Sequence, residues 1–279
     1  MSDQREEILE RWETMAAGWK AARANFQHIV EPVSRWMIDA IDPQPGQRVL
    51  EIAAGLGDTG LMAAERVGPE GSVVITDGTE GMVAAARERA EEVGATNVEL
   101  RTMQAEWLDL PAASVDGVLC RFGYMLLVDP EAALRETRRV LKPGGRVALA
   151  VWDAIEHNPW MGVIRQALVD SGVAPAAVPE GPGPFSLGSP DAVRDLLDVT
   201  GFDDIEVEPL DLAVDFPTLD AWWGHVMLTS GSTVEVVRTL SPADHYRLRE
   251  RVDAGYAPYV RDDGSLQVPA RALVAAATA

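Results

Sequence analysis

A glycine-rich turn follows a strongly apolar run and is the segment best suited to bind a ligand. Gly55, Gly57 and Gly60 form a G-x-G-x-x-G pattern directly after the run VLEIAA at 49–54. Glycine lets the backbone turn tightly and approach a ligand without a Cβ in the way. Asp77 follows about 20 residues later, where a carboxylate can accept hydrogen bonds from ribose hydroxyls. The pattern fits a dinucleotide as well as another adenosine-containing ligand.

Three further features surround this turn. Glu51 lies within the apolar run, where a carboxylate is unusual but suits polar backbone or a cationic ligand. Met82 is expected at the start of the next helix, as an apolar surface beside Asp77. Two later segments, MQAEWLDLP at 103–111 and RVLKPGG at 139–145, also distinguish this part of the chain.

These residues must be positioned by strands and helices that alternate along the chain. Apolar and alternating runs predict strands at 48–53, 72–76, 97–103, 114–121 and 146–152. Apolar side chains at three- and four-residue spacing predict helices at 59–67, 80–93 and 130–141. Such alternation indicates parallel βαβ units in a doubly wound sheet. Ligands bind to sheets of this kind beyond the carboxyl ends of the strands.

The flanking segments are less regular. Residues 5–41 are predicted to form two helices parted near Pro32, and 173–190 a loop. Ser189 and Pro190 predict the start of a helix that runs to about Val199. The remaining predictions are strands at 205–214 and 266–277, helices at 219–228 and 242–253, and a turn at 262–264.

Residues 47–152, a little over a third of the chain, resemble the class I S-adenosylmethionine-dependent methyltransferases. The resemblance rests on the glycine turn, Asp77 and the segments at 103–111 and 139–145, and is strongest toward the ubiquinone/menaquinone-biosynthesis-like group. It implies an enzyme that transfers a methyl group from S-adenosylmethionine to a small, partly apolar acceptor, with S-adenosylhomocysteine as product. The transfer would be an in-line displacement onto an O, N or C atom, in which the protein mainly orients the reactants.

The implied fold class is α/β, with a Rossmann-like doubly wound sheet of seven strands. Five would be parallel, and an antiparallel pair would follow toward the C-terminus. We expect an N-terminal helical cover at 1–45, a cofactor-binding core at 46–172, and a linker, helix and sixth strand at 173–214. A helical cap insertion at 215–262 and a final strand at 263–279 would complete the chain.

The resemblance also implies roles around the cofactor. Residues 51–57 would form the loop around its methionine part, together with Cys120 and Arg121 at the end of the fourth strand. Asp77 would hold both ribose hydroxyls, and Met82 would pack on the adenine.

Residues 104–106 would line the edge of the adenine ring. Gln104 stands where the family usually has Asp, but an amide can still bond the adenine amino group. Trp19 matches an aromatic residue of a helix that closes over the cofactor, or is a core tryptophan on an apolar stripe. The cofactor-binding candidates are Trp19, Glu51, Ala53, Gly55, Gly57, Asp77, Gly78, Met82, Gln104, Ala105, Glu106, Cys120 and Arg121.

The acceptor side is predicted from the loops after the fourth and fifth strands and from the cap. A general base is needed only if the acceptor must lose a proton. His157 is the candidate base, and a hydrogen-bonded loop histidine is the alternative. The candidates for lining the acceptor pocket, which can equally be packing residues, are Tyr124, Trp152, Trp160, Trp222 and His225.

The composition limits the classes of molecule that this protein is expected to bind. The net charge of −20 disfavours nucleic acids and anionic membrane surfaces. No apolar run approaches 18 residues, Cys120 is the only cysteine, and the first residues lack the apolar segment of a signal peptide. We therefore expect a cytoplasmic protein without a metal site, and the oligomeric state stays open. The alternative functions are an NAD-dependent oxidoreductase and a non-catalytic S-adenosylmethionine-binding protein.

Overall fold

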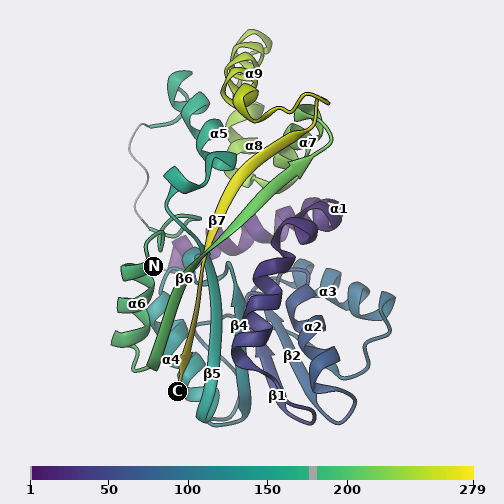
Figure 1. Cartoon of the computed structure of the whole chain (residues 1–279), viewed down its shortest axis with the longest axis vertical. Coiled ribbons are helices and arrows are strands. Elements are labelled where there is room, and N and C mark those ends of the chain that lie inside the picture. The colour runs from purple at the N-terminus through teal and green to yellow at the C-terminus, as the bar shows by residue number, and fades with distance from the viewer. Residues whose placement is uncertain (1, 176–180) are drawn as a thin grey trace.

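A seven-stranded sheet forms the centre of the computed structural model, which describes residues 2–175 and 181–279 (Figure 1). Its strand order is β3-β2-β1-β4-β5-β7-β6. The bounds are β1 Arg48–Glu51, β2 Ser72–Asp77, β3 Val98–Thr102, β4 Val115–Arg121, β5 Leu141–Trp152, β6 Asp203–Phe216 and β7 Leu266–Thr278. Strands β1 to β5 pair in parallel, whereas β7 is antiparallel to both β5 and β6. The predicted sheet is confirmed.

The helices cover this sheet and extend beyond its upper end. They are α1 Ser2–Ile41, α2 Asp58–Val67, α3 Glu80–Glu92, α4 Pro130–Val140, α5 Pro159–Asp170, α6 Pro190–Val199, α7 Leu219–Thr229, α8 Gly231–Thr239 and α9 Pro242–Tyr256. The sequence patterns did not single out α5 or α8. Of the predicted loop at 173–190, residues 176–180 lie outside the described residues. The described part before α6 contains no helix or strand.

The first helix differs from the prediction. The expected break near Pro32 is wrong, because α1 continues through Pro32 to Ile41. Proline inside a helix costs about 3 kcal/mol, since it removes one hydrogen bond and crowds the preceding turn. Burial of one large aliphatic side chain contributes roughly 1.5–3 kcal/mol. The second half of α1 buries five such side chains to 6% exposure or less, which outweighs the penalty: Ile29, Val30, Val33, Met37 and Ile38.

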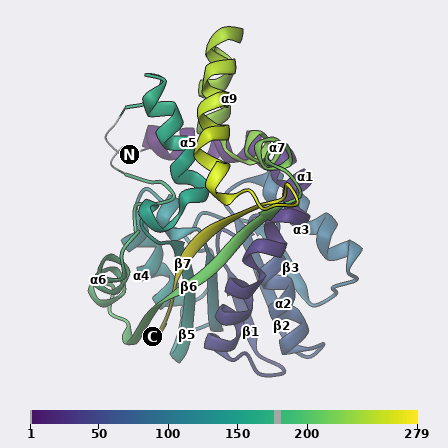
Figure 2. The ribbon, with the colours of Figure 1, turned by 45° about the horizontal axis from the view of Figure 1, so that its top comes forward.

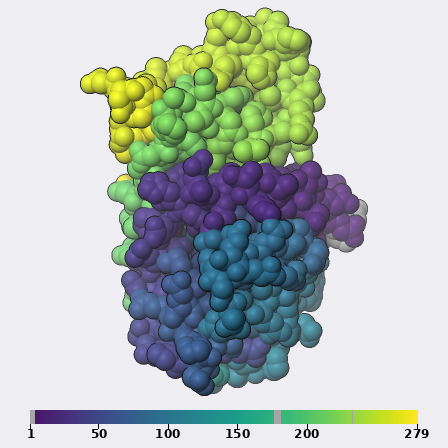
Figure 3. Space-filling model, turned by 90° about the vertical axis from the view of Figure 1, so that its right-hand side faces the viewer, coloured from purple at the N-terminus to yellow at the C-terminus, as the bar shows by residue number. Residues whose placement is uncertain are grey.

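Helix α1 lies between the sheet and the last helices. It contacts α2, α3 and α7. In Figure 3 its N-terminal part crosses the molecule as a band between the core and α7–α9, and its C-terminal part runs down along the core. Gly18 permits a close approach, because a Cβ there would overlap the carbonyl oxygen of Leu228 at the end of α7. Strands β6 and β7 reach up to this layer, where α5 and α9 pack side by side (Figure 2). In the described residues, no helix is both long and apolar enough to cross a membrane.

Asn158 connects the end of β5 with β7. Its side-chain amide donates to the carbonyls of Asp153 at 2.9 Å and Arg271 at 3.0 Å. Its Oδ1 accepts from the Arg271 backbone N–H at 2.9 Å and from Trp160 Nε1 at 2.8 Å. The residue is fully buried, so its removal leaves these groups without their hydrogen-bond partner.

We expect Asn158→Ala to lower the free energy of unfolding by about 3 kcal/mol, because each buried polar group left without a partner costs roughly 1–3 kcal/mol. Urea denaturation followed by circular dichroism measures this loss. Gln166→Ala, a change on the surface of α5, is the control and should alter stability by less than about 0.5 kcal/mol. A loss below 1 kcal/mol for Asn158→Ala would contradict the assignment.

Candidate functional site

The glycine turn is built around the carboxylate of Glu51 at the end of β1. Glu51 is buried, and its Oε2 accepts a hydrogen bond from the Gly60 N–H at 2.8 Å. A Cβ at Gly60 would lie 2.5 Å from this oxygen, so only glycine fits there. Burial raises the pKa of Glu51 to about 8, and the positive charge of Arg121 acts in the opposite direction. Gly55 and Gly57 have φ angles of +55° and +76°, which favour glycine.

Asp77 closes the turn from the end of β2. One carboxylate oxygen accepts the Gly55 N–H at 2.9 Å, and the other accepts the N–H and hydroxyl of Thr79 at 3.1 and 3.0 Å. Burial raises the pKa of Asp77, and these hydrogen bonds lower it. An ionised carboxylate has about four acceptor positions. The turn already uses most of them, so ribose hydroxyls would have to share or replace the present bonds of Asp77.

The first half of α1 lies over the glycine turn. Trp12 and Trp19 pack against a small apolar cluster that includes Leu56 of the turn and Met82 of α3. Trp19 thus lies on an apolar stripe and beside the candidate site at once. Its indole nitrogen is buried and has no hydrogen-bond partner among the described residues. Gly78 is also covered, because a Cβ there would lie 2.7 Å from the Leu9 side chain.

Charged side chains fasten this half of α1 to the helices below it. Glu13 accepts the Gly81 N–H at 3.0 Å at the start of α3. Arg23 bonds Asp58 at the start of α2, with a shortest distance of 2.5 Å. Both acceptors sit at helix N-termini, where negative charge is favourable. The first half of α1 therefore forms a closed cover over the glycine turn.

The adenine-edge segment lies between α1 and α4. Ala105 and Glu106 are buried and Gln104 is partly exposed. Glu106 accepts hydrogen bonds from Arg5 of α1 at 3.2 and 3.3 Å, and Arg5 also lies 4.5 Å from the ring centre of Trp107. The sequence did not identify this contact, because Arg5 and Trp107 lie about a hundred residues apart in the chain.

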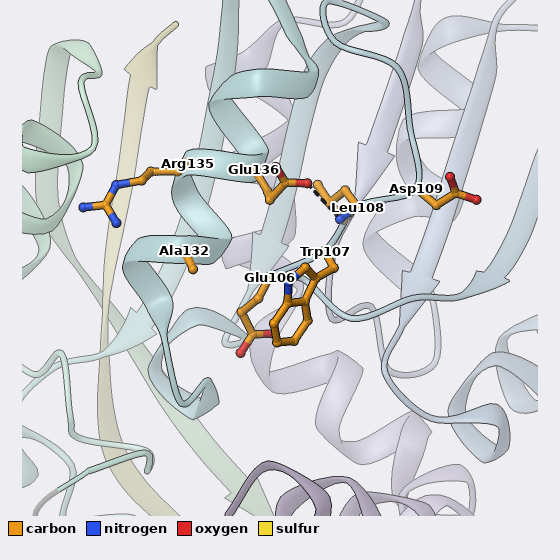
Figure 4. Close-up of a pocket in the computed structure, with 7 residues that line it drawn as sticks. All are labelled: Glu106, Trp107, Leu108, Asp109, Ala132, Arg135 and Glu136. Atoms are coloured by element: carbon orange, nitrogen blue, oxygen red, sulfur yellow. Dashed lines mark hydrogen bonds between the residues drawn. The ribbon is translucent and has the colours of Figure 1, made fainter. Parts of the chain in front are cut away.

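A groove of about 550 Å³ opens on the outer side of this segment (Figure 4). Trp107, 59% exposed, forms part of its wall, and Glu136 of α4 accepts the Leu108 N–H at 3.0 Å. The residues that line the groove are Glu106, Trp107, Leu108, Asp109, Ala132, Arg135 and Glu136. Of the predicted site residues only Glu106 reaches it, so the groove is separate from the glycine turn.

Cys120 and Arg121 end β4 beside the turn. Cys120 is fully buried, and burial raises its thiol pKa to about 12, so the thiol is neutral. Arg121 donates to Gln27 Oε1 at 2.9 Å and to Ser34 Oγ at 2.7 Å, both on α1. Burial lowers the pKa of Arg121, while Glu51 raises it. Gln27 and Ser34 escaped prediction, although both are polar residues within a largely apolar helix.

Four of the five acceptor-pocket candidates come together in one aromatic series. The series runs from the loop after β4 to α7. The ring centre of Trp152 lies 4.2 Å from that of Phe122 and 4.9 Å from that of Trp160. The ring centre of Trp222 lies 6.1 Å from that of Trp160 and 5.6 Å from that of His225. Phe122 has φ +61°, an uncommon conformation for a bulky residue. We call Phe122, Trp152, Trp160, Trp222 and His225 the aromatic series. Tyr124 is elsewhere, with its hydroxyl bonded to Thr137 at 2.6 Å inside the core.

His157 follows β5 in a short 3₁₀ turn, Ile155–His157. Its Nδ1 lies 2.7 Å from Oδ2 of the buried Asp153. The imidazole side chain is half exposed. A buried carboxylate that orients a histidine is the arrangement found where histidine acts as a base. Across residues 2–175 and 181–279, no three His, Cys, Asp or Glu side chains are grouped to hold a metal ion.

Comparison with known proteins agrees with this geometry. A family described as "Methyltransferase domain" matches residues 49–145. Nocamycin O-methyltransferase from Saccharothrix syringae is 34% identical over 69% of this chain and 72% of its own length. The chain belongs to the S-adenosylmethionine-dependent methyltransferases. Its cofactor is S-adenosylmethionine, and the two alternative functions considered from the sequence find no support among the relatives.

Other relatives differ in what they methylate. The ubiquinone/menaquinone biosynthesis C-methyltransferase of Xanthomonas oryzae is 40% identical over 40% of this chain and 45% of that protein. The arsenite methyltransferase of Halobacterium salinarum is 30% identical over 62% and 41%. Among solved structures, the YcgJ protein of Bacillus subtilis shares the fold with a TM-score of 0.59 and 20% identity, covering 88% of this chain and 97% of that one.

The raised pKa of Glu51 predicts how stability depends on pH. Because the folded protein keeps Glu51 protonated up to about pH 8 and the unfolded chain releases that proton near pH 4.5, this group lowers stability as the pH rises between those values. Glu51→Gln cannot ionise. We therefore expect its stability relative to the wild type to increase by about 4 kcal/mol between pH 5 and pH 9, at 1.36 kcal/mol per pH unit.

Urea denaturation of the cofactor-free protein at both pH values measures this change. Glu65→Gln, an exposed change on α2, should show no such dependence. Parallel curves for the wild type and Glu51→Gln would mean that Glu51 is ionised in the folded protein at pH 5.

Proposed function

We propose that this protein methylates a small, partly apolar acceptor that lies along the aromatic series. The observation that supports the proposal is the close approach of two loops: the glycine-turn loop on the cofactor side and the loop after β4, where the aromatic series begins. A Cβ at Gly123, in the loop after β4, would lie 2.6 Å from both Ala53 of the glycine-turn loop and Cys120. Phe122, the neighbour of Gly123, begins the aromatic series. The cofactor side and the acceptor side thus share one boundary.

The residues around the turn fit S-adenosylmethionine, which supplies an activated methyl group when bound. Gly55 and Gly57 leave room for close approach of a ligand, and Asp77 offers a hydrogen-bond acceptor at the end of β2. The side chains of Met82 and Trp19 offer apolar surface for the adenine. We assign Arg121 to the methionine end, because it is a buried cation beside Glu51. Holding reactants in one orientation can lower a barrier by up to about 7–11 kcal/mol.

We assign His157 as the base that takes a proton from an acceptor that must lose one. Asp153 is the positioning residue: its carboxylate holds a proton on Nδ1 and so leaves Nε2 able to accept one. Phenols and protonated amines need such a base, whereas an acceptor that is already nucleophilic does not.

Charge and composition support the choice of partner. The net charge of −20 opposes binding to the phosphates of nucleic acids, which favours a small-molecule acceptor. We also propose a cytoplasmic location, which suits a chain whose one cysteine is buried as a neutral thiol.

Replacement of Asp77 tests the cofactor site. Asp77→Asn should weaken S-adenosylhomocysteine binding by 10- to 100-fold, because a hydrogen bond to a charged group contributes about 1.5–3 kcal/mol. Isothermal titration calorimetry measures the affinity, and Asp109→Asn in the outer groove is the control. Unchanged affinity would remove Asp77 from the site, and tight NAD binding without S-adenosylhomocysteine binding would overturn the proposed function.

Replacement of His157 tests the base. A phenol acceptor is first identified by assaying methyl transfer to a panel of phenols, amines and quinols. With that phenol as substrate, His157→Ala should lower kcat by about 10²- to 10⁴-fold. Its affinity for S-adenosylhomocysteine should not change. Asp153→Asn should lower kcat less and alter the shape of the pH–rate profile, while His28→Ala on the exposed side of α1 is the control. Full activity of His157→Ala at every pH would refute the assignment.

A further inference from the structure

Ala53 has a backbone conformation that suits glycine better than alanine. Its φ angle is +49°, in the left-handed region where a Cβ crowds the following carbonyl oxygen. A glycine would avoid this strain, and Gly55 and Gly57 of the same turn also have positive φ angles. Strained residues of this kind cluster at ligand-binding and catalytic sites. The strain therefore points to a function for the methyl group of Ala53 beyond the stability of the turn.

Ala53 is also accessible within a turn that is otherwise closed. Among residues 51–60, only Ala53 and Gly55 are not buried. Gly55 donates to Asp77 at the end of β2, whereas Ala53 faces the loop after β4, on the other side of β1. The adenine-edge segment follows β3, beyond Asp77. A cofactor with its adenine at that segment and its ribose at Asp77 has its methionine part at Ala53.

The side chain of Ala53 meets the loop after β4 at Gly123. A Cβ at Gly123 would lie 2.6 Å from the Ala53 Cβ and 2.6 Å from Cys120 Sγ. The φ angle of Gly123 is −91°, which any residue can adopt, so these side chains restrict the position to glycine. We call Ala53, Cys120 and Gly123 the collar. The transferred group has to cross at the collar, because the cofactor side touches the acceptor side there.

The sheet holds the collar in place. The Ile52 N–H donates to the Leu119 carbonyl of β4 at 2.9 Å, and the Ala54 N–H donates to the Thr76 carbonyl of β2 at 2.9 Å. Cys120, opposite Ala53, is fully buried. The collar therefore cannot widen without breaking hydrogen bonds or displacing packed side chains, so a larger group meets a fixed wall.

We propose that Ala53 determines the size of the group that the enzyme transfers: its side chain leaves room for a methyl group on the cofactor sulfur and excludes an ethyl group. This inference rests on the proposed function, which assigns the methionine end of the cofactor to this side of the turn. A fixed apolar wall discriminates by volume, and one additional methylene against such a wall changes affinity by about 10- to 200-fold.

Two sulfonium compounds that differ by one methylene test the proposal: S-adenosylmethionine and its ethyl analogue, S-adenosylethionine. Isothermal titration calorimetry measures both affinities without an acceptor, so no group is transferred. The wild type should prefer S-adenosylmethionine by at least about tenfold, and Ala53→Gly should lower the preference to less than about threefold. Ala53→Gly should not lower the melting temperature, because the strain of alanine at positive φ outweighs the added freedom of glycine in the unfolded chain.

A second alanine with a positive φ angle provides the matched control. Ala113 is exposed, has φ +51° and lies in the segment before β4. Ala113→Gly thus relieves the same kind of strain away from the collar and should keep the wild-type preference. Ala53→Ser makes the opposite change at the collar: it enlarges the side chain and should raise the preference above that of the wild type.

The outcomes separate this inference from the proposed function. If the wild type binds neither S-adenosylmethionine nor S-adenosylhomocysteine, the proposed function itself is defeated. With normal binding of S-adenosylmethionine, the inference alone is defeated if the wild type binds the ethyl analogue equally well, if Ala53→Gly keeps the wild-type preference, or if Ala113→Gly loses it. Should Ala53→Gly not fold, a preference of Ala53→Ser no higher than that of the wild type overturns the inference.

Discussion

The buried carboxylate of Glu51 is the interaction around which the cofactor side is assembled. It accepts the Gly60 N–H and so fixes the start of α2 against the end of β1. Burial raises its pKa to about 8, and the positive charge of Arg121 of β4 acts against that rise. Arg121 in turn bonds Gln27 and Ser34 of α1. The sheet, the glycine turn and the covering helix are therefore connected through Glu51 and its neighbour Arg121.

The positions of the strands could be predicted because they follow from local sequence. Apolar and alternating runs mark β1 to β5, alternation marks β6, and β7 lies where the last strand was expected. The glycine turn was found for the same reason, since its spacing is visible within a dozen residues. The role of Gly60, however, depends on the closeness of Glu51, which only the folded chain reveals.

The errors and omissions concern contacts between segments far apart in the chain. Pro32 favours a helix break locally, but packing of α1 against the sheet decides otherwise. Asn158 gave no signal as a connection to β7, because its partner Arg271 follows 113 residues later. In the candidate site, Tyr124 has the right residue type in the right loop. Its hydroxyl is nevertheless used by Thr137 in the core, and no local pattern indicates that.

The placement of α1 has a mechanical consequence. Its first half covers the glycine turn through Glu13 and Arg23, and near its middle Gly18 seats the backbone directly against the end of α7. The contacts with the turn and with α7 all come from the first half of the helix, the part that crosses the molecule below α7–α9 (Figures 1 and 3). A displacement of this half that uncovers the turn would therefore also remove the support of α7.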